Sequence, residues 1–154
     1  ERAYQAYRQS EDPEQFSYFL VEQRVGWAAT APGVYYFRTT VILPVREQEI
    51  TEHEFTDAFD KETGEHIPNQ DLFTVGRAEA IAAIVAGTQA VRQEAQTMEE
   101  YFQWPYLSFE PDELVVCYPA GALPEQAPTS IWGVDYSGLV DVLPPWAVPE
   151  APEQ

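Results

Sequence analysis

The sequence is poor in cations. Lys61 is its only lysine, and lysine and arginine together number 8 against 26 aspartates and glutamates, so the formal net charge is −18. Nucleic acids and anionic membranes are bound through clustered cations, so this composition disfavours both as direct partners. It favours a basic surface on a partner protein, because net charge governs solubility and association.

The sequence has a single cysteine, Cys117, which excludes an internal disulfide and any CxxC metal or redox motif. Cys117 lies in the apolar run LVVCY, where a small buried side chain is the simplest interpretation. A nucleophilic cysteine would need a base and an electropositive setting, and neither is supplied by its sequence neighbours.

Local catalytic and cofactor motifs are also missing. There is no GxGxxG, GxxxxGK[ST], GxSxG or HExxH pattern. We therefore assign no catalytic, cofactor-binding or metal residues and expect no cofactor. A paired-carboxylate hydrolase leaves no local pattern, so a small enzyme without a motif stays open as an alternative.

No apolar run approaches the roughly 18 residues that a membrane-spanning helix needs, and no secretory signal pattern is present. We expect a cytoplasmic protein. The first residue is Glu1 rather than methionine, which is compatible with processing or truncation.

The stretch EFTDAFDKETGEHIP, residues 54–68, is dense in carboxylates. It predicts a hairpin that joins a polar strand over 50–59 to a short strand over 65–67. Asp60 opens the turn by accepting a backbone N–H, and Gly64 supplies the positive φ at which the second strand resumes.

The same stretch fits a metal site poorly. An EF-hand loop beginning at Asp60 would place Gly64 at a ligand position and Glu65 where glycine is required. A zinc site would need His53 and His66 together with a further ligand. We predict instead that both histidines are exposed among acids, with sodium or potassium loosely held nearby.

Residues 33–45, GVYYFRTTVILPV, are the strongest predicted strand, because they are rich in β-branched and aromatic side chains. One face carries Tyr35, Phe37 and Val41 and reads as core. The other face is mixed, and there we predict partner contacts at Tyr36 and Arg38. Exposed tryptophan is enriched in binding hot spots, so Trp132 and Trp146 are predicted as further contacts.

Helical spacing predicts one long helix over 77–102, with Gly87 in a stripe of small residues that lets another element approach. That element is a sheet or, alternatively, a second copy in a homodimer. Two N-terminal helices are expected, over 3–9 and from Asp12 to a stop at Gly26. The predicted fold class is α+β, a mostly antiparallel sheet packed by the long helix.

Short strand pairs are predicted over 106–118, about a turn at 110–113, and over 129–143, about a turn at 135–138. Many of the 13 prolines fall in this last third of the chain. We expect one domain over residues 1–147 and a flexible tail over 148–154.

Three functions fit these observations. The first is a non-enzymatic acidic interaction protein, an adaptor, assembly or structural component adapted to high salt, which binds a basic partner or itself. The second is an acidic mimic of DNA that blocks a nucleic-acid-binding protein, which would need carboxylates in ordered rows. The third is a small enzyme.

Overall fold

The computed structural model describes residues 22–45, 48–119, 121–124 and 129–150. These residues form two antiparallel sheets. Sheet A has the strand order β1-β2-β3-β4, and its strands are β1 (Glu22–Thr30), β2 (Val34–Val45), β3 (Gln48–Asp60) and β4 (His66–Ile67). Sheet B consists of β5 (Leu107–Phe109), β6 (Leu114–Tyr118) and β7 (Ser130–Val134), in that order.

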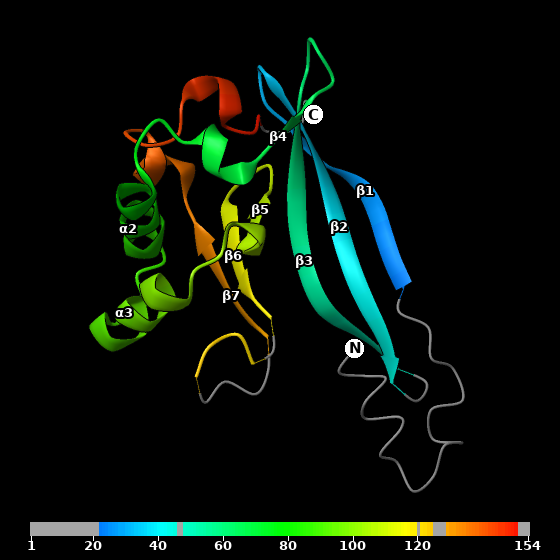
Figure 1. Cartoon of the computed structure of the whole chain (residues 1–154), viewed down its shortest axis with the longest axis vertical. Coiled ribbons are helices and arrows are strands. Elements are labelled where there is room, and N and C mark those ends of the chain that lie inside the picture. Colours follow the sequence, from blue (N-terminus) through cyan, green and yellow to red (C-terminus); the bar gives the residue numbers. More distant parts are fainter. Residues whose placement is uncertain (1–21, 46–47, 120, 125–128, 151–154) are drawn as a thin grey trace, which may run out of the picture.

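The two sheets and two short helices form layers. Sheet B lies between sheet A and the pair α2 (Arg77–Gly87) and α3 (Arg92–Tyr101), as Figure 1 shows. Four single turns of 3-10 helix connect these elements, namely η2 (Asn69–Leu72), η3 (Trp104–Tyr106), η4 (Tyr136–Leu139) and η5 (Pro145–Ala147). The predicted single sheet packed by one long helix is therefore wrong.

The predicted strand over 33–45 is confirmed by β2, which pairs with both β1 and β3. Its neighbour β1 overturns the expected N-terminal helix in part, because residues 22–26 of that helix lie in the strand and Gly26 pairs with Arg38. The rest of this helix and the helix over 3–9 fall outside the described residues.

One cluster of buried side chains connects sheet A, sheet B and the two helices. Tyr36 of β2 stacks on Phe109 of β5, with ring centroids 4.7 Å apart and an angle of 10° between the rings. Beside this stack, the backbone N–H of Phe109 donates to the Thr56 hydroxyl on β3 at 2.9 Å. The Phe109 N–H is a buried donor where the two sheets meet, and the Thr56 hydroxyl is the acceptor that satisfies it.

The predicted helix over 77–102 is broken, because α2 ends at Gly87 and α3 starts at Arg92. A Cβ on Gly87 would lie 2.3 Å from Cγ1 of Val134, so strand β7 approaches the backbone at that point. Gln89 then has a φ of 56°, a left-handed value that ends the helix. As expected, the small residue at position 87 lets a sheet approach closely, but the helix ends there instead of continuing to residue 102.

The hairpin over residues 50–67 is confirmed. Strand β3 pairs with β4, and Gly64 has a φ of 73°. One carboxylate oxygen of Asp60 accepts from the backbone N–H groups of Glu62, at 2.8 Å, and Thr63, at 2.7 Å. The turn residues thus act as the sequence predicts.

The later strands are predicted in part. Strands β5 and β6 confirm the pair over 106–118, since the Glu110 N–H donates across the turn to the Glu113 carbonyl at 3.1 Å. The segment 129–143 forms only strand β7, and η4 replaces its expected partner. Of the expected tail, Pro149 is buried and the Glu150 N–H donates to the Thr30 carbonyl at 2.7 Å, so residues 148–150 pack on sheet A.

Candidate binding surface on sheet A

The outer face of sheet A, away from sheet B, is built mainly of aromatic side chains. Residues directly opposite each other in an antiparallel pair place their side chains on the same face. Trp27 of β1 lies opposite Phe37 of β2, and Phe59 of β3 lies opposite both Tyr35 and His66. We call these five side chains, Trp27, Tyr35, Phe37, Phe59 and His66, the aromatic face.

The aromatic face is a continuous series of ring contacts across four strands. The Trp27 ring centroid lies 5.4 Å from Tyr35 and 5.5 Å from Phe37. Phe37 meets Phe59 edge-on at 5.7 Å, and Phe59 meets His66 edge-on at 5.4 Å. Such edge contacts hold neighbouring rings in place, so the face is preorganised.

This face remains accessible to solvent. Trp27 is 56% exposed and Tyr35 is 39% exposed, and Val25 beside them on β1 is 63% exposed. The ammonium of Lys61 lies 5.0 Å from the centroid of the Tyr35 ring, which places one cation at its rim. Contiguous exposed apolar surface of this kind marks interaction sites.

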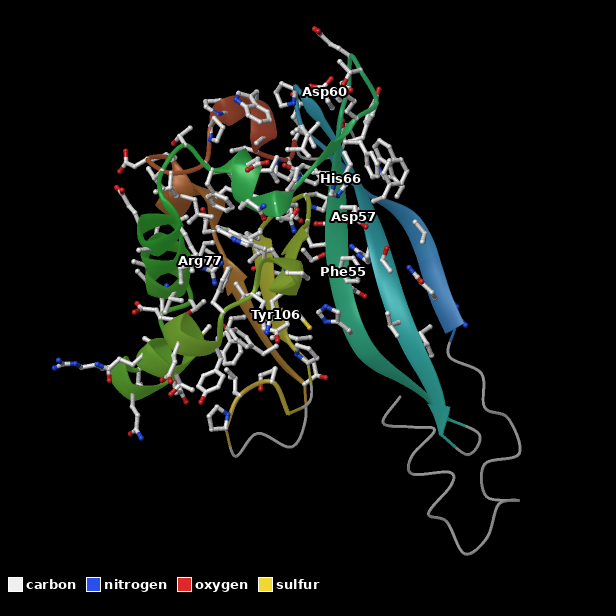
Figure 2. All side chains as sticks on the ribbon, in the orientation of Figure 1. Phe55, Asp57, Asp60, His66, Arg77 and Tyr106 are labelled. Atoms are coloured by element: carbon white, nitrogen blue, oxygen red, sulfur yellow. The ribbon has the colours of Figure 1, made fainter. Side chains whose placement is uncertain are left out.

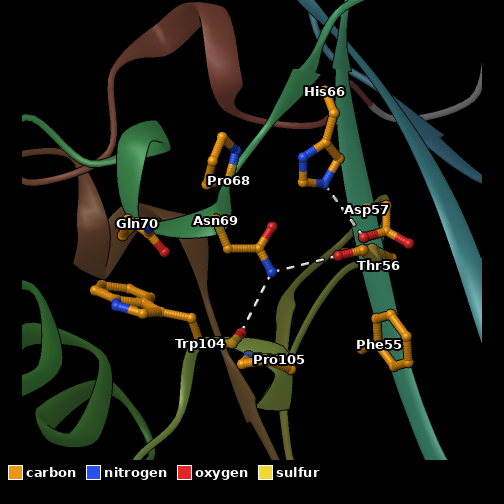
Figure 3. A pocket seen from close by; sticks show the side chains of 9 residues that line it. All are labelled: Phe55, Thr56, Asp57, His66, Pro68, Asn69, Gln70, Trp104 and Pro105. Carbon is orange, nitrogen blue, oxygen red and sulfur yellow. Dashed lines mark hydrogen bonds and ion pairs between the residues drawn. The ribbon is translucent and has the colours of Figure 1, made fainter.

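A pocket of about 290 Å³ adjoins the aromatic face where strand β4 ends. Strand β4 pairs with Ala58 and Phe59 of β3, and next to them the Thr56 carbonyl accepts a hydrogen bond from Asn69 instead of from a strand. We call this the edge pocket; Figures 2 and 3 show its position and its lining, which is Phe55, Thr56, Asp57, His66, Pro68, Asn69, Gln70, Trp104 and Pro105.

Asn69 fixes the polar character of the edge pocket. Its Nδ2 donates to the backbone carbonyls of Thr56 and Trp104, both at 3.3 Å, and these bonds use both amide hydrogens. Figure 3 shows its carbonyl oxygen pointing away from both bonds. Asp57 adds a carboxylate, whose Oδ1 lies 3.4 Å from Nε2 of His66.

Groups with displaced pKa values lie away from this surface or serve the fold. Burial raises the pKa of Tyr36, Tyr136 and Tyr118, whose hydroxyls donate to backbone carbonyls. Burial also raises the pKa of the Cys117 thiol, which is 3% exposed, as expected for a core residue. Bonds from backbone N–H groups lower the pKa of Asp60 in the hairpin turn.

The four predicted contact residues are dispersed. Tyr36 is a core residue with 0% exposure, and its hydroxyl donates to the Ala147 carbonyl at 2.6 Å, so its side chain has no surface to offer a partner. Arg38 bridges the two sheets. Its guanidinium donates to both oxygens of Glu110 and lies 3.4 Å from Glu54.

The two predicted tryptophans lie on other parts of the molecule. Trp132 is half-buried on β7 and lines a groove beside Met98 of α3, and its ring meets Tyr118 edge-on at 5.7 Å. Trp146 is 42% exposed and covers Gly33, where a Cβ would lie 3.2 Å from its ring. The structure brings neither of them to the aromatic face.

Trp27 is not among the predicted contact residues, because the sequence around it predicts the end of a helix. Phe37 and Phe59 do lie in predicted strands, but the face of β2 that carries Phe37 is not the core face. The signal was alternation in WAATAPGVYYF, where aromatic residues flank a tight turn and suit two paired strands.

One of the two histidines differs from its prediction. His66 is exposed, but His53 is half-buried and meets the ring of Tyr106 edge-on at 5.9 Å. In the part of the chain that the structure describes, no three His, Cys, Asp or Glu side chains are placed to hold a metal ion. Nor does any helix of that part have the length and apolar character to cross a membrane.

Comparison with known proteins identifies the fold and leaves the family open. No family model matches the sequence, and no curated protein matches it. Among solved structures, the chain is similar to a DUF3298 family protein from Pseudomonas aeruginosa PAO1, with a TM-score of 0.54 and 14% sequence identity. The similarity covers 82% of this chain and 63% of that one, so the chain spans less than two thirds of its neighbour.

Proposed function

We propose that this chain is a non-enzymatic interaction protein that binds a basic partner protein through the aromatic face of sheet A. The observation that carries the proposal is the exposure of Trp27, at 56%, within an ordered series of rings. Tryptophan and tyrosine dominate binding hot spots because they bury a large area at little cost in side-chain entropy.

The charge of the chain selects the kind of partner. A formal net charge of −18 repels a second copy and repels nucleic acid, although stacked rings on a sheet are also a way to hold bases. A partner with a basic rim around an apolar patch is attracted at long range and then buries Trp27 and Phe37 on contact.

Catalysis has less support at the same surface. A catalytic acid or base is usually enclosed, which displaces its pKa. The pair of His66 and Asp57 is open to solvent, with side chains 50% and 40% exposed. Thr56, which carries the only hydroxyl among the residues lining the edge pocket, already accepts a bond from Phe109.

High salt and a cytoplasmic location belong to the same proposal. Acidic side chains in place of lysine keep a protein hydrated in brine, where long-range attraction is screened within about 3 Å at molar salt. Aromatic burial survives such screening, because it does not depend on charge.

Affinity capture from the source organism, followed by binding measurements with the purified partner, tests this function. We expect the partner to be basic. We also expect Trp27→Ser and Phe37→Ser each to weaken the free energy of binding by about 2 kcal/mol or more. Val140→Ser is the matched control, because Val140 is an exposed apolar residue outside sheet A. An acidic partner, unchanged affinity, or a homodimer that dissociates in Trp27→Ser would contradict the proposal.

A further inference from the structure

The residues that line the edge pocket include hydrogen-bond acceptors, at Asp57 and Asn69, and donors, at Gln70 and Trp104. Both amide hydrogens of Asn69 are bonded to backbone carbonyls, which leaves its Oδ1 as the group free for a ligand. Asp57 is an acceptor when ionised, and within the described residues no hydrogen bond reaches its Oδ2. Pro68 and Pro105 have no backbone N–H to donate.

The walls of the pocket are aromatic. Phe55 and Trp104 lie on opposite sides of Asn69 in Figure 3. Trp104 already receives a cation on its ring, since the guanidinium carbon of Arg77 lies 5.6 Å from its centroid. Arg77 does not line the pocket, and its guanidinium is tied to the Phe102 carbonyl at 3.0 Å.

Acceptor groups beside an aromatic ring suit a ligand that donates several hydrogen bonds and that is flat. A guanidinium has five N–H donors and no acceptor, and it stacks on aromatic rings. An anion would face the carboxylate of Asp57. Among the residues that line the pocket, Asp57 carries the only carboxylate, and it lies beside His66.

The size of the pocket agrees with a single side chain. Its volume, about 290 Å³, is at the lower end for small-molecule sites, which run from about 300 Å³ upward. The pocket also shares His66 with the aromatic face, so one partner surface reaches both.

We propose that the edge pocket binds the guanidinium of an arginine on the basic partner. This inference rests on the proposed function and specifies which residue of the partner enters which part of the surface. The carboxylate of Asp57 and the Oδ1 of Asn69 accept its N–H groups, and the ring of Phe55 offers it a flat surface on which to stack. Arginine is itself enriched in hot spots, which fits an anchor beside the aromatic face.

Titration of the ¹⁵N-labelled full chain with blocked Gly-Arg-Gly tests this inference, with the lysine and citrulline peptides as probes matched in length. We expect saturable shifts at the amides of Phe55, Asp57 and Asn69 and at the indole N–H of Trp104. The lysine peptide should bind several-fold more weakly, because an ammonium cannot bond in a plane. The citrulline peptide, which is flat but uncharged, should give no saturable shift.

Two variants locate the effect. Asp57→Asn and Phe55→Leu should each weaken binding of the arginine peptide at least about fivefold, since one removes the charge and the other the ring. Asp141→Asn is the control, because Asp141 is an exposed carboxylate outside both sheets. Circular dichroism of each variant verifies that it is folded.

The inference is overturned by equal binding of the citrulline peptide, by shifts spread over exposed carboxylates such as Asp141, or by no saturable shift up to about 20 mM peptide. Its failure is separate from failure of the proposed function. A partner that depends on Trp27 but not on Asp57 would overturn the arginine pocket alone, while a partner that ignores Trp27 would overturn the function.

Discussion

Arg38 connects the two sheets and illustrates how one residue serves the fold. Its guanidinium bonds both carboxylate oxygens of Glu110, and the Ser108 hydroxyl donates to the same carboxylate at 2.8 Å. Glu110 is mostly shielded from solvent, with its side chain 17% exposed. A carboxylate in that position depends on its partners for solvation.

Removing the arginine should therefore destabilise the fold. We expect Arg38→Leu to lower the free energy of unfolding by about 1–3 kcal/mol, because Glu110 would keep its charge without its cation. Urea denaturation measures the change, and Arg92→Leu, at an exposed site on α3, is the matched control. Equal stability of Arg38→Leu and wild type would refute the bridging role.

Tyr36 gives a second prediction at this scale. Tyr36→Phe removes the bond from its hydroxyl to the buried Ala147 carbonyl and should cost about 1 kcal/mol of unfolding free energy, while Tyr35→Phe should cost almost nothing. Thermal or urea denaturation compares the two. If Tyr35→Phe is the more damaging change, the two faces of β2 are assigned wrongly.

Arg38 and Tyr36 show how much of the structure of β2 could be predicted from its sequence. Alternation predicted a strand, but it favoured the face of Tyr35 and Phe37 as core because the other face carries Arg38 and Thr40. The true core face tolerates them because Glu54 and Glu110 pair with them. Those carboxylates come from positions 14 and 72 residues away, so no local pattern contains them.

The break between α2 and α3 shows how an element responds to a close neighbour. A Cβ at position 87 would collide with Val134, so alanine there should destabilise despite its better helix propensity. We expect Gly87→Ala to lower the unfolding free energy by about 1–3 kcal/mol.

Further variants sharpen this prediction. In Gly87→Ala combined with Val134→Ala, the new methyl group has room. The double variant should therefore lose less unfolding free energy than the sum of the losses in the two single variants. Gly138→Ala is the control, because a Cβ there meets nothing within 4 Å. Denaturation curves of wild type, Gly87→Ala, Val134→Ala, the double variant and Gly138→Ala measure these changes, and a stabilised Gly87→Ala would disprove the close contact.

The hairpin turn predicts a dependence on pH. The N–H groups of Thr63 and Glu62 lower the pKa of Asp60, so the folded state holds its proton less tightly than the unfolded state. This stabilisation is present above the usual aspartate pKa, near 3.9, and is lost as the pH falls through the lower folded value.

We therefore expect Asp60→Asn to lose less stability than wild type between neutral pH and pH values below about 4. Urea denaturation at a series of pH values measures this. Glu62→Gln, an exposed acid on the same turn, is the control. Parallel curves for wild type and Asp60→Asn would contradict the role of the turn.

At the scale of elements, the sequence predicted what is local and missed what is distant. The β3–β4 hairpin and the β5–β6 pair follow from turn residues beside each strand. The helix break depends on Val134, which lies 47 positions beyond Gly87. The second sheet depends on strand β7 pairing with β6, although β6 ends at Tyr118 and β7 begins only at Ser130.

The whole molecule combines a dense negative charge with an exposed aromatic face. If the charge is an adaptation to brine, stability should increase from low to molar potassium chloride, because screening weakens repulsion among 26 acidic residues against 8 cations. Melting temperatures at a series of salt concentrations test this. A flat or falling curve would contradict salt adaptation and leave the binding surface unaffected.

At this scale, composition indicates an acidic chain that is rich in aromatic residues. The basic partner stays a prediction. The position of the surface could not be inferred, because it is defined by which face of sheet A meets sheet B and by where β4 stops.

The most direct test of the account is to map the captured partner on the labelled chain by amide shifts at saturation. The account predicts that the perturbed amides centre on Trp27, Phe37 and Phe59 and extend to Asp57 at the edge pocket. Perturbations centred instead on the groove between Met98 and Trp132, with the aromatic face unchanged, would contradict it.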